Sequence, residues 1–86
     1  MAEERIEVVR RCVAAWAAGD LAEVAEAEAA GDEVYALVRI TSHGAGSGIE
    51  NVATFPFVFT IHDGLIVRWR GFVEASEARE AASLPT

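Results

Sequence analysis

The first segment has the hydrophobic pattern of an amphipathic helix. Its large apolar residues are three or four positions apart and therefore share one face of a helix. They are Ile6, Val9, Val13 and Trp16. Glutamates fill the first turns, where the helix dipole favours negative charge, and Gly19 is a natural C-terminal cap. The pattern predicts a helix from Glu3 to Ala18.

The next segment is dominated by alanine and glutamate. Asp20 can cap a helix, and Glu23 stands three residues later, where a capping box places it. The apolar face is weak, but alanine and glutamate both have high helix propensity. We therefore expect a second helix over residues 21–30, ended by the Gly-Asp pair that follows.

Apolar residues alternate with others in the second half, which predicts three strands. The strands run from Val34 to Thr41, from Thr54 to His62 and from Leu65 to Val73, and residues 49–53 begin the second one. One face of these strands carries Val34, Ala36, Val38, Ile40, Phe55, Phe57, Phe59, Ile61, Leu65, Val67 and Trp69. The first helix is the expected cover for this continuous apolar face.

Turn residues mark how these strands connect. Asp63-Gly64 between two strand patterns predicts a tight hairpin, because the turn needs positive φ and glycine supplies it without strain. Pro56 donates no hydrogen bond, so it marks an edge, a bulge or the start of a strand. Glu74 or Ser76 then caps a final helix that ends near Leu84. The sequence thus predicts an α+β domain, a curved antiparallel three-stranded meander with helices on one face.

Composition limits the class of partner. The 86 residues form one domain, and the net charge of −7 with no lysine argues against nucleic acid and against an anionic membrane surface. Neither a signal peptide nor a membrane-spanning run is evident, so a cytoplasmic protein is expected. The single Cys12 excludes an internal disulfide and is interpreted as a small buried hydrophobe.

Several stretches, in this order, resemble a SnoaL-like domain, a polyketide cyclase family in the superfamily named for nuclear transport factor 2. They are Gly31 to Val34, Val38-Arg39, Gly46 to Gly48, Phe57 to Ile61, Asp63 to Val67 and the helix Glu77 to Leu84. The first helix, ending in Trp16-Ala17-Ala18-Gly19-Asp20, resembles the opening of the family. The resemblance covers most of the chain and implies a cystatin-like cone around a ligand cavity.

The chain departs from this family in length. Complete members carry further helices and at least one strand between the first helix and the main sheet, and these close the cone. Only residues 21–30 stand in that place here. A shortened, incomplete cone leaves an aromatic face and a sheet edge open, which a second chain can cover. We therefore expect a homodimer.

No catalytic residue is evident. The resemblance implies an acidic proton acceptor on the last strand near a Trp, but this chain has Arg70 and Gly71 there. His43 and His62 lack a third ligand at metal spacing, and His62 is expected to be exposed in a turn. The glycines after His43 are not followed by Lys-Ser/Thr or by a helix, so they do not indicate a phosphate loop. Neither a metal nor a cofactor is expected.

The outer face of the predicted sheet carries arginines. Arg39, Arg68 and Arg70 can form a cationic patch there, but pairing with glutamates across strands or between chains is the simpler interpretation.

Two functions from different classes remain. The first is a homodimeric, non-enzymatic module. The second is binding, or isomerase- or cyclase-type conversion, of a small hydrophobic molecule such as a polyketide or terpenoid in an apolar cavity, as the resemblance implies. The residues expected to line such a cavity are Trp16, Val38, Phe57, Phe59 and Trp69.

Overall fold

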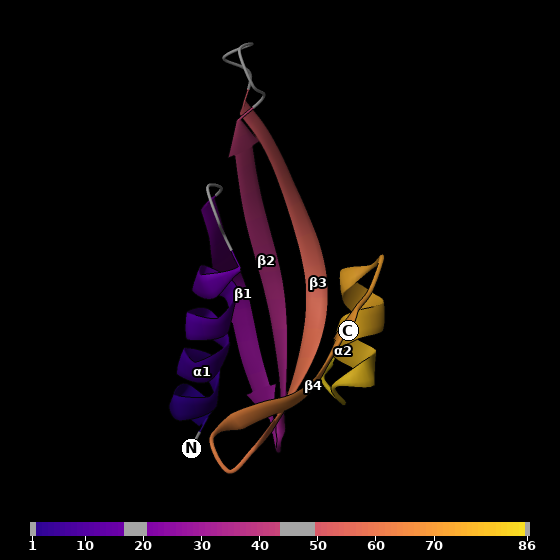
Figure 1. Cartoon of the computed structure of the whole chain (residues 1–86). Helices are drawn as coiled ribbons and strands as arrows, with labels where there is room; N and C mark the ends of the chain where they lie inside the picture. The colour runs from indigo at the N-terminus through magenta and orange to yellow at the C-terminus, as the bar shows by residue number, and fades with distance from the viewer. Residues whose placement is uncertain (1, 17–20, 44–49, 86) are drawn as a thin grey trace.

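A computed structural model describes residues 2–16, 21–43 and 50–85 of the chain (Figure 1). The elements in order are helix α1 (Ala2–Ala15), strands β1 (Leu21–Ala30), β2 (Glu33–His43), β3 (Glu50–His62) and β4 (Leu65–Gly71), and helix α2 (Ala75–Ala81). The predicted caps Gly19 and Asp20 and the glycine-rich stretch 44–48 lie outside the described residues.

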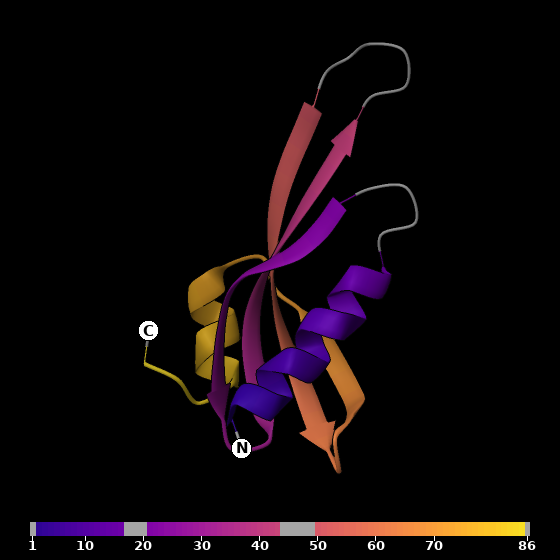
Figure 2. The same cartoon turned by 90° about the vertical axis from the view of Figure 1, so that its left-hand side faces the viewer.

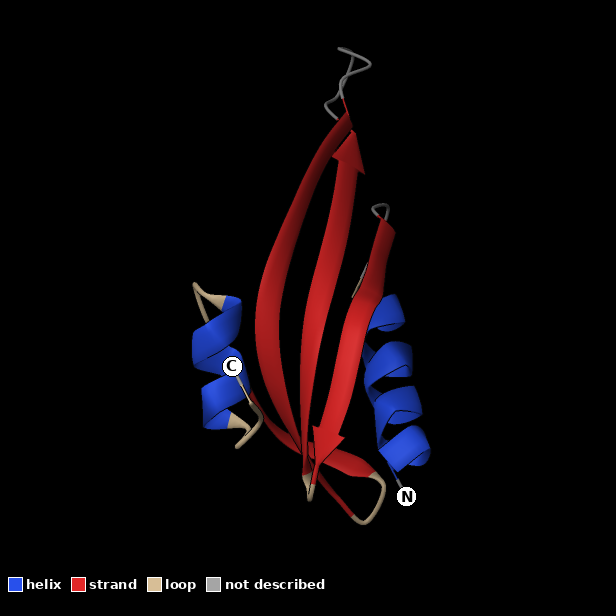
Figure 3. Cartoon of the chain, turned by 180° about the vertical axis from the view of Figure 1, so that it is seen from behind, coloured by secondary structure: helices blue, strands red, loops and turns tan. Residues whose placement is uncertain are grey.

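The strands form one antiparallel sheet in the order β1-β2-β3-β4, so each strand pairs with its neighbour in sequence. The α+β class and the three predicted strands are confirmed. The sheet has four strands, however, and the prediction of a three-stranded meander is wrong. Figure 3 shows β1, β2 and β3 side by side with a helix beyond each side of them.

The predicted second helix is wrong, because Leu21–Ala30 is strand β1. Pairing with β2 shifts by one residue between Val24 and Glu26, so Ala25 is an extra residue without a partner. Without this bulge, Val24 and Ala27 would point to opposite faces, since they are three positions apart. The bulge brings both onto the face that packs against α1. This spacing of three, together with high helix propensity, is what made the segment resemble a helix.

The main core lies between α1 and the sheet. The predicted helical stripe is confirmed, because Val9 and Val13 are completely buried and Ile6 packs beside them. The sheet contributes Ala22, Val34, Ala36, Val38, Phe59 and Ile61 to this core. Cys12, at the flank of the stripe, is half-buried rather than buried.

Helix α2 packs on the face of the sheet opposite to α1, so the prediction of helices on one face is wrong. Ala78 and Ala82 contact Tyr35 and Val58, and all four are buried. The two small alanine side chains allow α2 to approach β2 and β3 closely. Because both faces are covered, β2 is apolar on both sides along its first half, which is unusual for an antiparallel strand.

The faces of β4 differ from the prediction. The pairing with β3 shifts between Thr60 and Ile61, leaving Val67 as a bulge. Ile66 therefore joins Trp69 on the α1 side, where it packs against the core. Leu65 and Val67, which were expected on the continuous apolar face, are exposed.

The tight turns have the backbone geometry that their residues favour. Asp63 (φ 52°) and Gly64 (φ 75°) connect β3 to β4 as a two-residue loop with positive φ at both positions, which confirms the predicted hairpin. Gly31 (φ 60°) takes the first position of the β1–β2 loop.

Pro56 lies where the β4 partner of β3 ends. Its carbonyl accepts a hydrogen bond of 2.9 Å from the N–H of Phe72, just beyond the last paired residue of β4. A residue in a strand directs its N–H and C=O to the same side, so the missing N–H of Pro56 also faces this side. The proline therefore removes no β2–β3 hydrogen bond. Beyond it, β2 and β3 continue as an arm past α1 and α2 (Figure 2).

We expect Gly64→Ala to destabilise the folded chain by about 1–2 kcal/mol, because the Cβ of alanine is sterically unfavourable at positive φ. An added Cβ meets no atom within 4 Å, so the cost is conformational and not a clash. Urea unfolding measures it. Gly64→Asn is the matched control, because asparagine tolerates this region better than alanine. Equal losses for the two variants would contradict the explanation.

Candidate functional site

Four aromatic side chains cluster on the α1 side of the sheet, at the end of that helix. Trp16 lies just beyond α1, Phe57 and Phe59 come from β3, and Trp69 comes from β4. The ring centroids of Trp16 are 5.5 Å from Phe57, 5.8 Å from Phe59 and 5.9 Å from Trp69. Phe57 lies 5.9 Å from Phe59 and 6.0 Å from Trp69. These separations are those of favourable tilted and edge-to-face ring pairs.

The aromatic cluster is open to solvent on one side. Phe59 is completely buried, but Trp69 is 59% exposed and Trp16 is 39% exposed. The opening arises because α1 packs mainly over β1 and β2. Phe55 precedes Phe57 by two residues on β3 and therefore lies on the same face, where it is 43% exposed. The result is an apolar surface formed by Trp16, Phe55, Phe57 and Trp69, which we call the aromatic surface.

The structure thus brings together four of the five residues predicted to line a cavity. The fifth, Val38, is completely buried in the core below α1. None of the five lines either of the two hollows described here, the groove discussed next and a shallow depression along α1. What these residues form in the described chain is a packed cluster with an open side. Phe55 was not among the predicted site residues, although its place in the apolar alternation could have included it.

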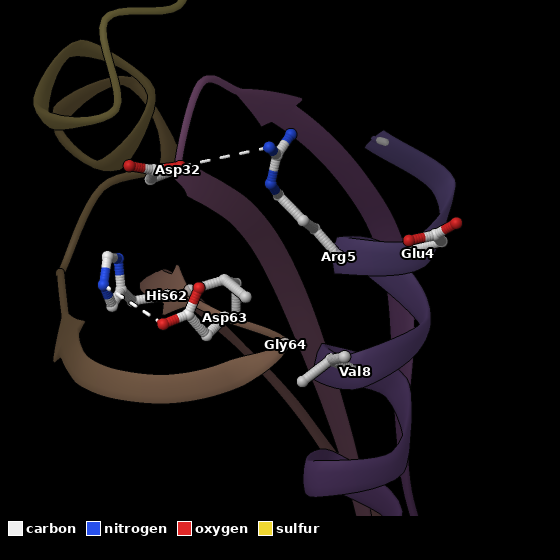
Figure 4. A pocket seen from close by; sticks show the side chains of 8 residues that line it. Glu4, Arg5, Val8, Asp32, His62, Asp63 and Gly64 are labelled. Carbon is white, nitrogen blue, oxygen red and sulfur yellow. Dashed lines mark ion pairs between the residues drawn. The ribbon is translucent and has the colours of Figure 1, made fainter.

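A polar groove of about 470 Å³ lies where the start of α1 meets the two hairpin turns. In Figure 4, Arg5 of α1 extends toward Asp32 of the β1–β2 turn, while His62 and Asp63 lie at the β3–β4 turn. The guanidinium of Arg5 is 3.9 Å from the Asp32 carboxylate, and His62 Nε2 is 3.5 Å from Asp63 Oδ2. Glu4, Val8, Ile61 and Gly64 complete the lining.

Most polar side chains of this groove are exposed to solvent. Its lining residues include no hydroxyl or thiol that could act as a nucleophile. The His62 side chain is 70% exposed, as expected for a residue beside a turn, and its carboxylate neighbour is more exposed still. Surface ion pairs of this kind contribute little energy and do not exclude water. The sequence did not predict the groove, because its residues come from three separated segments.

Two of the three arginines predicted on the outer sheet face, Arg39 and Arg70, pair with glutamates across strands. Arg39 donates a hydrogen bond of 2.8 Å to Glu23, its direct cross-strand neighbour. Arg70 lies 3.8 Å from Glu33. The interpretation of Arg39 and Arg70 as cross-strand partners of glutamates is therefore confirmed.

Arg70 occupies the position where the family resemblance implies a catalytic acid. Besides pairing with Glu33, its guanidinium lies 5.6 Å from the ring of Phe72, where it makes a cation–π contact. Glu33 Oε2 is buried and receives no hydrogen bond within the described residues. The guanidinium thus supplies charge compensation to a partly buried carboxylate, which is a structural role.

Arg79 of α2 contacts residues of the sheet. Its guanidinium makes an ion pair of 2.8 Å with Glu28 of β1 and lies 5.3 Å from the ring centroid of Tyr35. It also donates a hydrogen bond to the carbonyl of Pro85. Burial raises the pKa of Tyr35 above its ordinary value of 10.0, the nearby Glu26 raises it further, and Arg79 lowers it.

The other candidate residues gain no chemical role from the structure. The side chain of His43 lies outside the described part of the chain. Among the described residues, no three His, Cys, Asp or Glu side chains gather where they could hold a metal ion. Glu74 is the N-cap residue of α2 by position, although its side chain makes no capping hydrogen bond.

Comparisons of the chain with family models, with curated proteins and with solved structures found no match. The resemblance to SnoaL-like domains therefore stays a prediction. Among the described residues, no helix is long and apolar enough to cross a membrane.

We expect stability to fall as the pH rises above about 10, because the pKa of Tyr35 is raised in the folded chain. In that range the unfolded tyrosine has lost a proton that the folded one retains, so deprotonation favours unfolding. The chain has one tyrosine and no lysine, so phenolate absorbance reports this group alone. Urea unfolding between pH 8 and 11 measures the loss.

Tyr35→Phe is the matched control, because it keeps the ring beneath Arg79 and removes the ionisable hydroxyl. Its stability should not share the loss above pH 10. An absorbance titration with an ordinary or lowered midpoint in the folded chain would refute the assignment.

Proposed function

We propose that this chain is a non-enzymatic module that works as a homodimer joined through its sheet. The observation that carries the proposal is the aromatic surface, where two tryptophans and Phe55 remain partly exposed on one face of a small sheet. Exposed contiguous aromatic residues on a small domain are typical of an interface, where Trp and Tyr are enriched among the residues that dominate binding energy. A second copy supplies an equally apolar cover.

The same proposal requires no catalytic group. The groove lining includes no hydroxyl or thiol, and Arg70 is engaged with Glu33 and Phe72. We further propose that the sheet is the wall of a shortened SnoaL-like cone. The order of helix, long hairpin, second hairpin and short helix supports this, as does the aromatic lining on the α1 side.

We expect the chain to sediment as a dimer at tens of micromolar. Phe55→Thr should weaken the dimer about tenfold or more, because it removes a half-exposed ring from the aromatic surface and keeps a strand-forming residue. Sedimentation velocity over a concentration series measures the dissociation constant. A chain that sediments as a monomer throughout that range would rule out the proposal.

Leu65→Thr is the matched control for this experiment. Leu65 is 68% exposed and pairs with His62, about seven positions along β3 from Phe55. The same kind of substitution there should leave the dissociation constant unchanged.

The aromatic surface also favours a second function, the binding of a small hydrophobic molecule. Four rings with centroids 5.5–6.0 Å apart, two of them partly open, can stack against a flat apolar compound. Conversion of such a compound would need an acid or base, which the aromatic side chains do not supply. Binding alone is therefore the form of this function that the cluster supports.

Intrinsic fluorescence tests the second function directly, because the only two tryptophans of the chain, Trp16 and Trp69, are both in the cluster. A polycyclic or terpenoid-like ligand should quench or shift the emission with a saturable dependence on concentration. Trp69→Phe should reduce the signal and weaken binding, while Leu65→Thr, at the β3–β4 turn, should change neither. The absence of a saturable change across a broad panel would refute ligand binding and leave the dimer unaffected.

A further inference from the structure

Strand β3 is longer than its partner β4, and its first part has an open edge. β4 pairs with β3 from Phe57 to His62, while β2 pairs with β3 from Glu50 to Thr60. On the β4 side, none of the residues that the structure describes pairs with Glu50–Phe55. Figure 1 shows this stretch of β3 rising beyond the level of β4 and α2. Every second residue of this stretch therefore directs its backbone N–H and C=O to an edge that no described strand covers.

The orientation of these backbone groups follows from Pro56. Its carbonyl accepts from Phe72 and so faces the β4 side. Strand residues alternate in the side to which their N–H and C=O point, and the β2–β3 register runs without a break through this stretch. The N–H and C=O of Val52 and Thr54 consequently face the open edge.

The other edges of the sheet are protected. The outer edge of β1 carries a bulge at Ala25, and glutamates occupy positions 23, 26 and 28. The outer edge of β4 carries the bulge at Val67 together with Arg68 and Arg70. Bulges and charged side chains are the usual means by which proteins prevent unwanted strand pairing. Residues 51–55 of β3 contain neither a charge nor a bulge.

From this contrast we infer that the β3 edge at residues 51–55 is the surface that a second copy of the chain pairs with, antiparallel and about a two-fold axis. The inference rests on the proposed homodimer and specifies how it forms. The two β3 strands then join two four-stranded sheets into one continuous sheet of eight strands.

Self-complementarity favours a second copy as the occupant, and at this edge charge does not oppose it. Each chain carries a net charge of −7, so two copies repel each other over most of their surface. The segment 51–55 is a place where they can meet without placing like charges side by side. An antiparallel pair of identical strands is also self-complementary, because each N–H that faces the axis meets a C=O from the other copy.

Side chains near the axis fit this pairing. Ala53 is small enough for the close approach of a central cross-strand pair, and the flanking Val52 and Thr54 are β-branched residues that strands favour. Phe55 lies on the same edge and on the aromatic surface, so strand pairing and burial of the aromatic surface occur in one contact. Pairing of residues 51–55 alone buries less than the roughly 800 Å² per partner of a standard interface, so the aromatic contribution is needed.

Thr54→Pro tests the inference, because proline removes the N–H that would bond the second copy. That N–H faces away from β2, and Pro56 already occupies the equivalent orientation two residues further along, so the fold should tolerate the change. Thr54→Val is the matched control, since it keeps the N–H and a β-branched side chain. In sedimentation, Thr54→Pro should raise the dissociation constant about tenfold or more, while Thr54→Val should leave it unchanged.

Amide hydrogen exchange of the unmodified chain is the second measurement, and it holds even if the proline variant fails to fold. The amides of Val52 and Thr54 should exchange at least about tenfold more slowly at concentrations where the dimer forms. If the chain dimerises but both amides exchange at the same rate at all concentrations, or if folded Thr54→Pro dimerises as tightly as Thr54→Val, the edge inference is overturned and the proposed homodimer stands. If the chain is monomeric at all concentrations, both fall.

Discussion

The structure depends on the burial of one hairpin, β2 with β3, from both faces. On one face, Val34 and Phe59 pack beneath α1, and on the other, Tyr35 and Val58 pack beneath α2. Neither helix is long enough to be stable alone in water, so each owes its stability to this contact with the sheet. The hairpin in turn needs both helices, because an apolar strand pair open to water on either side would aggregate. The two helices and the hairpin therefore stabilise one another.

The sequence predicted what depends on local periodicity. The stripe of Val9 and Val13, the long strands and the Asp63-Gly64 turn could be read directly, because each is set by neighbouring residues. β1 could not, since alanine and glutamate favour a helix when considered alone. Pairing with β2 overrides that preference, and the bulge at Ala25 hides the alternation of the strand behind a spacing of three residues. In β4 the bulge at Val67 similarly reverses the expected faces of Leu65 and Ile66, while Trp69 keeps its predicted face.

The candidate site was predicted in part. Alternation along β3 and the helical stripe placed Trp16, Phe57, Phe59 and Trp69 on one face, and they do contact one another. Their degree of exposure could not be read from the sequence, because it depends on where α1 crosses the sheet. The helix lies over β1, a strand that was not expected, and so leaves the β3–β4 side of the face open. The polar groove was equally unpredictable, since tertiary packing brings its three segments together.

The unequal edges of this sheet determine how far association can proceed. A domain with two receptive edges adds copies at both and grows into a fibre. In this chain the edges of β1 and β4 carry charges and bulges, and the open part of β3 is a single short neutral segment that ends at Pro56. Each copy thus offers one receptive segment for the proposed pairing. In the proposed dimer, antiparallel pairing occupies this segment in both chains at once, so none of the described strands keeps an uncharged open edge for a third chain.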